Sequence, residues 1–244
     1  MKIASIHQPH YHPWLGLLDK IAHSHVHIVL DDVQFRRGNY HNRALYNLNG
    51  ESLLLTLPVQ NKGLQTHGLK INEMKITSQK DLQKNFKTLQ HRYGKTPGWQ
   101  FIADELNLIY QTREDSLLQL NLKLLQLMLK CFNINTPLIL ASSYGVSSVR
   151  NQRLVDLCLK TKADSYLSGN GAKKYMDDAL FDSHGINVTY QNFNHPSYLQ
   201  HKHFKFIPGC LALDWYCLFP DDASIWFKAQ RSNSIEDKEF SLAL

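Results

Sequence analysis

The chain has 244 residues, 43% of them hydrophobic and 20% charged, which is the balance of a globular protein large enough to bury a full hydrophobic core. Its formal net charge of +6 favours an anionic partner, but the basic residues are dispersed and form no block, so nucleic acid is not expected as the partner. The longest apolar runs, such as residues 52–59, are far shorter than the roughly 20 residues of a membrane span.

The N-terminus and the cysteines bear on the cellular compartment. The first apolar stretch is too short for a signal peptide, and histidine and proline follow it at once. The four cysteines are widely spaced and form no CxxC pair, so the sequence indicates neither a disulfide framework nor a zinc site. We therefore expect a cytoplasmic protein with free thiols and no metal centre.

The first part of the chain predicts two strands joined by a helix. Residues 2–6 alternate and are rich in β-prone types, and residues 26–30 form a second short apolar run. Between them, residues 15–24 carry apolar side chains at helical spacing. Two strands joined in this way make a right-handed βαβ unit with a parallel sheet.

The middle of the chain predicts a hairpin and then helices. Residues 43–48 and 52–59 flank Asn49-Gly50, a pair that tolerates the positive φ angles of a tight hairpin turn. A further strand is expected over residues 70–76. The periodic apolar positions that follow predict three helices, over residues 79–92, 97–110 and 115–132.

The alternation of strands and helices then returns. We expect strands over residues 138–142, 165–168 and 187–191, and helices over residues 151–161, 173–183, 212–218 and 222–228. The predicted fold class is α/β, a Rossmann-like and mostly parallel sheet with a β-hairpin and helical insertion. We expect one domain over residues 1–230, with the insertion at about residues 40–135, followed by a polar tail over residues 231–244.

The loop after the first strand is the first candidate site. In parallel α/β folds ligands bind at the carboxyl ends of the strands, and the loop from His7 to Gly16 lies there. We assign His7 a catalytic role and give Gln8, Tyr11 and Trp14 substrate-binding roles. The alternative is a structural loop whose aromatic side chains fill the core.

The end of the second predicted strand is the second candidate. Asp31 and Asp32 could act as a catalytic base there, since paired carboxylates at a strand end serve acid–base chemistry. Gln34, Asn42 and Arg43 follow as substrate-binding candidates, because an arginine can clamp an anion with two hydrogen bonds. The alternative is a solvated acidic turn neutralised by its own arginines.

Three later segments complete the set of candidates. Ser168, Gly169 and Asn170 form a turn between a strand and a helix, where backbone amides can cradle a phosphate. Arg153 follows a serine-rich loop and could bind an anion. A tight structural connection explains the turn as well, and helix capping explains the serines as well.

The segment after the last strand supplies the remaining two candidates. His195 is a candidate general base, and Tyr198 is a candidate substrate-binding residue in the same run. An ordinary loop histidine is the alternative.

These motifs together resemble the WbqC-like proteins. The opening signature is Gln8-Pro9-x-Tyr11-x-Pro13-Trp14-x-Gly16, followed by Asp31-Asp32-Val33-Gln34-Phe35 and Asn42-Arg43. The later part is Arg153-Leu154-Val155-Asp156-Leu157-Cys158, Tyr166-Leu167-Ser168-Gly169-Asn170-Gly171-Ala172 and His195-Pro196-x-Tyr198. The chain departs from the pattern at His10, where the family more often has Asn, and this departure counts against a general catalytic role for His10.

The resemblance implies a bacterial protein associated with O-antigen or other surface-polysaccharide biosynthesis. The activity it implies is a transferase, which adds a glycyl or other amino-acyl group to an amino sugar on a nucleotide or lipid carrier. The expected partner is therefore an anionic small molecule, such as a nucleotide-sugar or a lipid-linked sugar. The cofactor stays open between ATP with Mg²⁺ and an activated amino-acyl donor.

Two other functions stay open. The strand, His/Pro loop, helix and strand at the N-terminus are similar to the HIGH-type nucleotidylyltransferases, although the glycine expected between His7 and His10 is absent. A protein of that type would be a nucleotide-dependent ligase or nucleotidylyltransferase. The third possibility is a non-catalytic protein that binds a sugar or its carrier.

Overall fold

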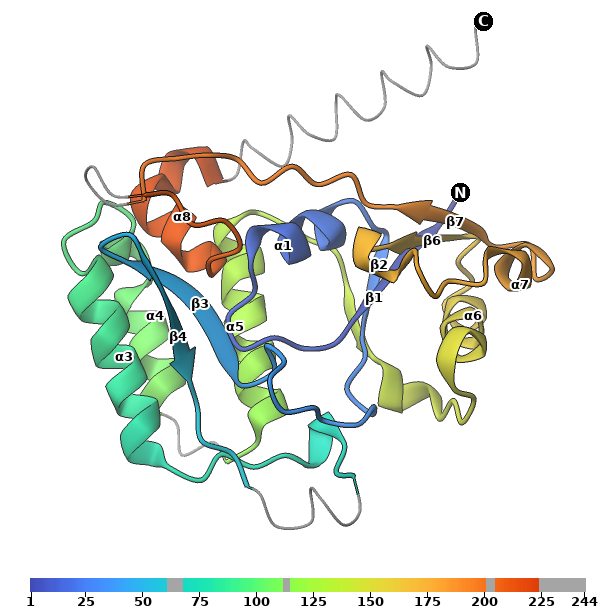
Figure 1. Cartoon of the computed structure of the whole chain (residues 1–244), viewed down its shortest axis with the longest axis horizontal. Coiled ribbons are helices and arrows are strands. Elements are labelled where there is room, and N and C mark those ends of the chain that lie inside the picture. Colours follow the sequence, from blue (N-terminus) through green and yellow to red (C-terminus); the bar gives the residue numbers. More distant parts are fainter. Residues whose placement is uncertain (61–67, 112–114, 201–204, 224–244) are drawn as a thin grey trace, which may run out of the picture.

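The computed structural model describes residues 1–60, 68–111, 115–200 and 205–223, and its centre is a five-stranded parallel sheet (Figure 1). The strands lie in the order β5-β2-β1-β6-β7. Their bounds are β1 Ile3–His7, β2 Val26–Val29, β5 Leu138–Leu140, β6 Ser165–Ser168 and β7 Asn187–Tyr190. Counted within the sheet, this is the order 3-2-1-4-5 of Rossmann-like folds. The structure thus confirms the predicted fold class.

The helices that connect these strands cover both faces of the sheet. On one face α1 (Leu15–Ala22) packs its apolar residues, such as Leu17 and Ile21, into the larger hydrophobic core. On the other face α6 (Arg150–Lys160) and α7 (Asp178–Asp182) bury side chains against Ala4 and Ile6 of β1. Because β1 is buried from both sides and paired along both edges, it is the middle of the sheet.

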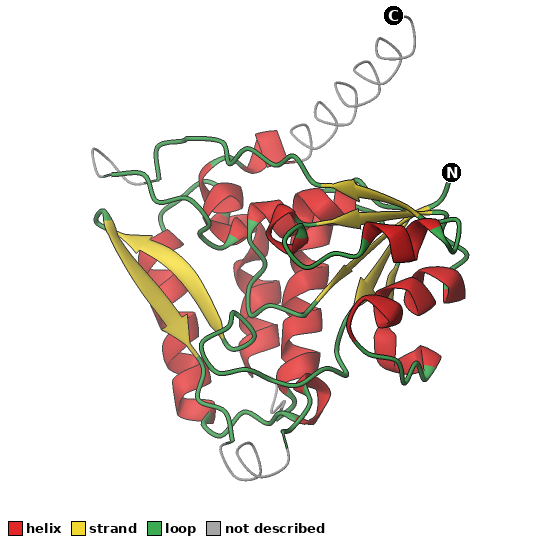
Figure 2. Ribbon diagram, turned by 45° about the vertical axis from the view of Figure 1, so that its right-hand side comes forward, coloured by secondary structure: helices red, strands yellow, loops and turns green. Residues whose placement is uncertain are grey.

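The insertion lies beside the sheet as a second layer of structure. It contains the antiparallel hairpin of β3 (Arg43–Leu48) and β4 (Glu51–Thr56), and the helices α3 (Gln79–Tyr93), α4 (Trp99–Gln111) and α5 (Leu117–Cys131). The hairpin and the parallel sheet lie on opposite sides of the molecule with helices between them (Figure 2), and α5 is one of these helices (Figure 1). The hairpin turns through Asn49 and Gly50, both at positive φ, as the Asn-Gly pair predicts. The chain then returns through α8 (Ala212–Leu218) to pack on α5.

Two predicted elements are wrong. Residues 70–76 form no strand; Ile71–Glu73 is a 3-10 turn, closed by the Glu73 carboxylate that accepts the Lys70 amide at 2.7 Å. The helix expected over residues 173–183 is shortened to α7, because Asp177 caps it by accepting the Leu180 amide. The helix expected at 222–228 lies largely outside the described residues, and the polar tail at 231–244 lies wholly outside them.

Most of the other predicted strands and helices are present in the structure. These strands and helices agree with the predicted ranges to within three residues at each end. The single domain over residues 1–230 stays a prediction. Within the described parts of the chain, no helix is long and apolar enough to cross a membrane.

Two histidines are buried in the interior without charge. His27, on β2, is 1% exposed and its Nδ1 lies 2.8 Å from the Ser5 hydroxyl. His12 is 4% exposed and its Nε2 lies 2.6 Å from the Tyr110 hydroxyl. Burial lowers the pKa of both imidazoles to about 3, because the charged form loses its hydration. Both histidines are therefore neutral at physiological pH.

These histidines predict that acid destabilises the fold. Since their pKa in the folded state lies below the value of about 6.5 in the unfolded chain, only the unfolded chain takes up protons as the pH falls. Their contribution is complete above pH 6.5 and is lost toward pH 3. We expect about 2 kcal/mol of unfolding free energy to be lost per histidine between pH 7 and pH 5.

Urea denaturation at several pH values measures this loss. The variant His27→Asn removes one titrating group and should flatten the dependence by its share. The matched control is His91→Asn, because His91 is exposed on α3. Equal flattening in both variants would contradict the assignment.

Candidate functional site

A pocket of about 460 Å³ opens at the carboxyl ends of β1 and β6. The chain leaves β1 toward β2 on one side and returns to β6 on the other, so this is the topological switch point of the sheet. In folds of this kind ligands bind in the crevice at that point. We call it the switch-point pocket; its walls are Ile6, His7, Trp14, Gly16, Leu17, Lys20, Tyr166, Ser168, Gly169, Asn170, Gly171, Ala172, Gln191 and Phe193.

Lys20 supplies a buried positive group to this pocket. Its side chain is on α1, only 3% of the residue is exposed, and its Nζ donates to the Ile6 carbonyl at 2.9 Å. Within the described residues it has no ion-pair partner. Burial lowers its pKa to about 7. An ammonium group with so little compensation favours an anionic ligand beside it.

Sequence reasoning missed Lys20, although a signal was present. Lys20 lies three residues after Leu17 and one before Ile21, so it shares the apolar face of the predicted helix. A lysine at such a position is either buried or extended along the face toward water. Here it is buried, with its end group at the carboxyl end of β1.

His7 lies at the end of β1 as a neutral hydrogen-bond acceptor. Its Nδ1 lies 2.8 Å from the Gln8 carbonyl, which can only accept, so Nδ1 carries the proton and Nε2 carries the lone pair. Burial, with the charge of Lys20, lowers the pKa of His7 well below its ordinary value. The ring also contacts His10 edge to face at 4.7 Å. Gln8 lines a neighbouring cavity of about 10 Å³, the size of one water.

An aromatic wall closes one side of the pocket. The Trp14 and Phe193 rings meet edge to face with centroids 5.5 Å apart. Gly16 lies beneath Trp14, and a Cβ there would approach the indole to 2.2 Å, so only glycine fits. Gln191 bonds the Gly16 carbonyl at 2.7 Å and Asp19 Oδ2 at 2.6 Å, which fixes the last strand's exit against α1.

The Ser168–Gly171 turn forms the opposite side. The Ser168 side chain is completely buried, and the Tyr166 hydroxyl interacts with its oxygen. Asn170 and Gly171 are exposed at the mouth. A Cβ on Gly169 or Gly171 would meet nothing within 4 Å, so the space beside the turn is open. The predicted turn residues therefore line the pocket.

The two predicted carboxylates lie outside the walls of the pocket. Asp31 is buried and accepts the Ser142 amide at 3.0 Å and the Asn72 side chain at 3.2 Å. Asp32 forms an ion pair with Arg153, which also donates to the Val146 and Ser148 carbonyls. These contacts tie the end of β2 to the segments around β5 and α6. These contacts hold the loops together, and the catalytic role of the two carboxylates stays a prediction.

Four further candidates also lie away from the pocket. Tyr11 is completely buried and bonds the Tyr110 hydroxyl at 2.7 Å within the core. The other three belong to the hairpin and its approach: Gln34 is exposed and bridges to Lys70, Asn42 donates to the Leu57 carbonyl, and Arg43 donates to the Gly38 carbonyl.

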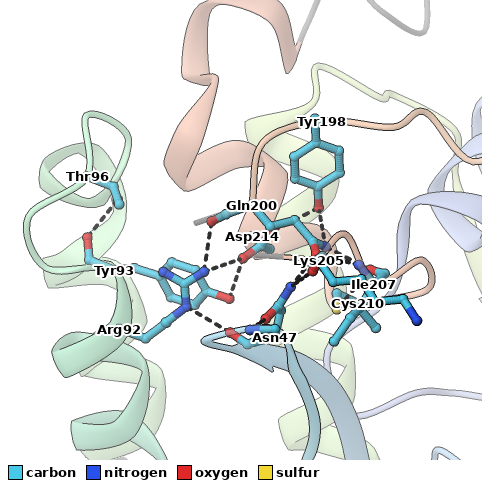
Figure 3. A network of polar contacts seen from close by, with 11 residues as sticks. Asn47, Arg92, Tyr93, Thr96, Tyr198, Gln200, Lys205, Ile207, Cys210 and Asp214 are labelled. Atoms are coloured by element: carbon cyan, nitrogen blue, oxygen red, sulfur yellow. Dashed lines mark hydrogen bonds and ion pairs between the residues drawn. The ribbon is translucent and has the colours of Figure 1, made fainter. Parts of the chain in front are cut away.

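Tyr198 belongs to a buried polar network that joins it to residues of α3 and α8 (Figure 3). Its hydroxyl and that of Tyr93 each donate to Asp214 at 2.8 Å, and Arg92 lies 3.7 Å from the same carboxylate. Burial raises the pKa of Asp214, and these partners oppose the rise. His195 packs its ring 5.7 Å from Phe193, so it touches the aromatic wall from behind.

The Asp32–Arg153 pair predicts a stability effect. Each side chain is only 12% exposed, so Asp32→Ala leaves a nearly buried guanidinium without its counter-charge. We expect a loss of about 3 kcal/mol in the free energy of unfolding, measured in urea. The double variant Asp32→Ala with Arg153→Met should recover most of it, because it removes the stranded charge. Unchanged stability in the single variant, with loss of activity, would instead favour a catalytic Asp32.

Comparison with known proteins finds a matching family and a similar protein. The model of the WbqC-like protein family matches residues 8–224. The uncharacterized protein Rv1507c of Mycobacterium tuberculosis is 31% identical over 217 residues, which cover 88% of this chain and 92% of the relative. No solved structure matches the chain.

Proposed function

The chain belongs to the WbqC-like protein family, and on that premise we propose that it is a transferase of bacterial surface-polysaccharide (O-antigen) biosynthesis. The proposed reaction adds a glycyl or other amino-acyl group to the amine of a sugar on a phosphate-bearing carrier. The single observation that carries the proposal is Lys20, a buried lysine with no ion-pair partner among the described residues, in the wall of the switch-point pocket.

Lys20 is suited to the phosphate of the carrier. A nucleotide-sugar and a lipid-linked sugar share a diphosphate, and a phosphate oxygen would supply the charge that the buried ammonium lacks. The net charge of +6 favours the approach of such a substrate. The volume of about 460 Å³ is in the range of small-molecule sites.

The remaining walls are suited to a sugar. Trp14 and Phe193 offer an apolar aromatic surface for the face of a pyranose ring. Opposite them, the exposed side-chain amide of Asn170 can bond sugar hydroxyls. An apolar wall with a few polar groups is the usual composition of such sites.

His7 is the wall residue suited to remove the proton. The acceptor amine attacks the carbonyl carbon of the activated amino-acyl group; the new N–C bond forms, the donor's leaving group departs, and the amine's extra proton goes to His7 Nε2. The pKa of His7 is lowered partly by Lys20, so a phosphate that neutralises Lys20 would raise the basicity of His7. Asp31, Asp32 and Arg43 lie outside the pocket, and we assign them the role of holding the neighbouring loops.

Two variants test this assignment with UDP-glucosamine as the probe. Lys20→Met should bind the probe at least tenfold more weakly by titration calorimetry, because a charge-assisted bond is lost. His7→Gln should bind it normally but lose about 100-fold or more in transfer from glycine with ATP or from activated glycyl donors, followed by mass spectrometry. Lys84→Met, on the exposed face of α3, is the matched control.

The same experiment separates an enzyme from a binding protein. Unchanged affinity in Lys20→Met contradicts the pocket assignment. A wild-type protein that binds the probe but yields no product with any donor favours the non-catalytic sugar- or carrier-binding function.

A HIGH-type nucleotidyl transfer is the second candidate, and the contact between His7 and His10 favours it. The strand, loop, helix and strand on which the resemblance rests are present as β1, the loop after it, α1 and β2. This function predicts ATP binding at the pocket and release of pyrophosphate from ATP and the acceptor. Calorimetry that detects no ATP affinity, with or without Mg²⁺, would remove it. Binding that persists unchanged in His7→Gln and His10→Gln would count against the histidine contact as the phosphate site.

A further inference from the structure

A patch of exposed apolar and basic side chains lies beside the mouth of the switch-point pocket. Val149 and Arg150 follow β5, and Lys173, Lys174 and Tyr175 follow β6. Val149 is 69% exposed and Tyr175 is 71% exposed. We call these five residues the edge patch. Since the strands are parallel, both segments leave the sheet at its carboxyl edge.

The two segments of the edge patch are joined to each other. The Asn151 side chain, in the first turn of α6, donates to the Tyr175 carbonyl at 3.0 Å. Arg153 donates to the Val146 carbonyl at 2.7 Å and to the Ser148 carbonyl at 3.2 Å, which holds the chain just before Val149. Hydrogen bonds therefore hold in place the two segments that carry the exposed apolar side chains.

The charge of the edge patch is positive. Arg150, Lys173 and Lys174 form no ion pair with any described residue. Two acidic residues follow in the chain: Asp177 caps α7, Asp178 accepts the Tyr190 hydroxyl at 2.7 Å, and neither forms an ion pair with a described cation of the patch. Lys173 Nζ lies 5.5 Å from the centre of the Tyr190 ring, and Arg150 and Lys174 remain available to an anionic surface.

The loop after β2 also carries basic and aromatic side chains at the carboxyl edge of the sheet. Arg36 is exposed, and Tyr40 is 47% exposed with its ring 5.7 Å from His10. His10 lies in turn against His7, a wall residue of the pocket. Basic and aromatic side chains therefore follow β2 as well as β5 and β6 at this edge of the sheet.

We propose that the edge patch docks this protein on an anionic phospholipid membrane. Lys and Arg are attracted to anionic head groups, while Tyr and an aliphatic side chain favour the boundary between head groups and acyl chains. A site for nucleic acid would need a denser basic stripe with several stacking aromatics. Charge complementarity and the exposed apolar pair together favour the membrane.

The docking surface also selects between the two carriers. Ala172, a wall residue of the pocket, directly precedes Lys173 of the patch. A lipid-linked sugar held in the docked membrane would therefore lie at the pocket mouth, whereas a nucleotide-sugar needs no membrane. The choice of a lipid carrier rests on the proposed function; membrane docking does not.

Co-sedimentation with vesicles tests the docking. We expect the full chain to bind vesicles of phosphatidylcholine with phosphatidylglycerol, more weakly as salt rises, and not to bind pure phosphatidylcholine. The variant Arg150→Gln, Lys173→Gln, Lys174→Gln should bind about fivefold more weakly per charge removed, or roughly 100-fold in all. Val149→Ser with Tyr175→Ser should weaken the binding that remains at high salt.

The control removes the same charge elsewhere. Lys80→Gln, Lys84→Gln, Lys87→Gln alters only exposed lysines of α3, on the far side of the insertion, and should bind like the wild type. Absence of vesicle binding, or an equal loss in this control, overturns the proposal. Tighter binding of single-stranded RNA through the same patch residues overturns it in favour of nucleic acid. Binding of soluble UDP-glucosamine is measured without membrane, so failure of docking and failure of the proposed function are distinguishable.

Discussion

The site depends on the position of β1 between β2 and β6. A central strand satisfies its backbone groups through its two neighbours, yet here the Ile6 carbonyl, near the carboxyl end of β1, accepts from Lys20 of the following helix. That bond holds the Lys20 ammonium group at the switch point, where the chain connections from β1 and to β6 run to opposite sides. The same topology brings the loops after β1, β2, β5 and β6 to one edge. The switch-point pocket, its buried lysine and the position of the edge patch all follow from this arrangement.

The charges at this edge are controlled mainly by burial. His7 and Lys20 face one space, and removal from water disfavours the charged form of each. The charged form of either base is therefore costly in the pocket, and an anion beside it would return both groups toward their ordinary basicity. Under the proposed function, ligand binding and proton uptake would be linked in this pocket.

The fold was predictable where local chemistry decides it. Asn49-Gly50 dictates its turn, and the βαβ unit around residues 2–30 follows from periodicity alone. Residues 70–76 alternate like a strand, but Glu73 bonds back to the Lys70 amide and closes a turn instead. The shortened α7 has the same kind of cause, a side chain that competes for backbone amides. Such contacts depend on geometry that periodicity does not report.

The site was predictable in part, and the reason lies in which neighbour a residue meets. Residues near the ends of β1 and β6, such as Trp14 and Ser168, line the pocket because strand order places both ends at the switch point. Asp32 also follows a strand at the same edge, but β2 lies one strand farther away and Arg153 takes its carboxylate. Lys20 was hidden by its helix, since a lysine on an apolar face looks the same in sequence whether it is buried or extended to water. These residues differ in their tertiary pairing: Asp32 has a counter-charge in Arg153, whereas Lys20 has no ion-pair partner among the described residues.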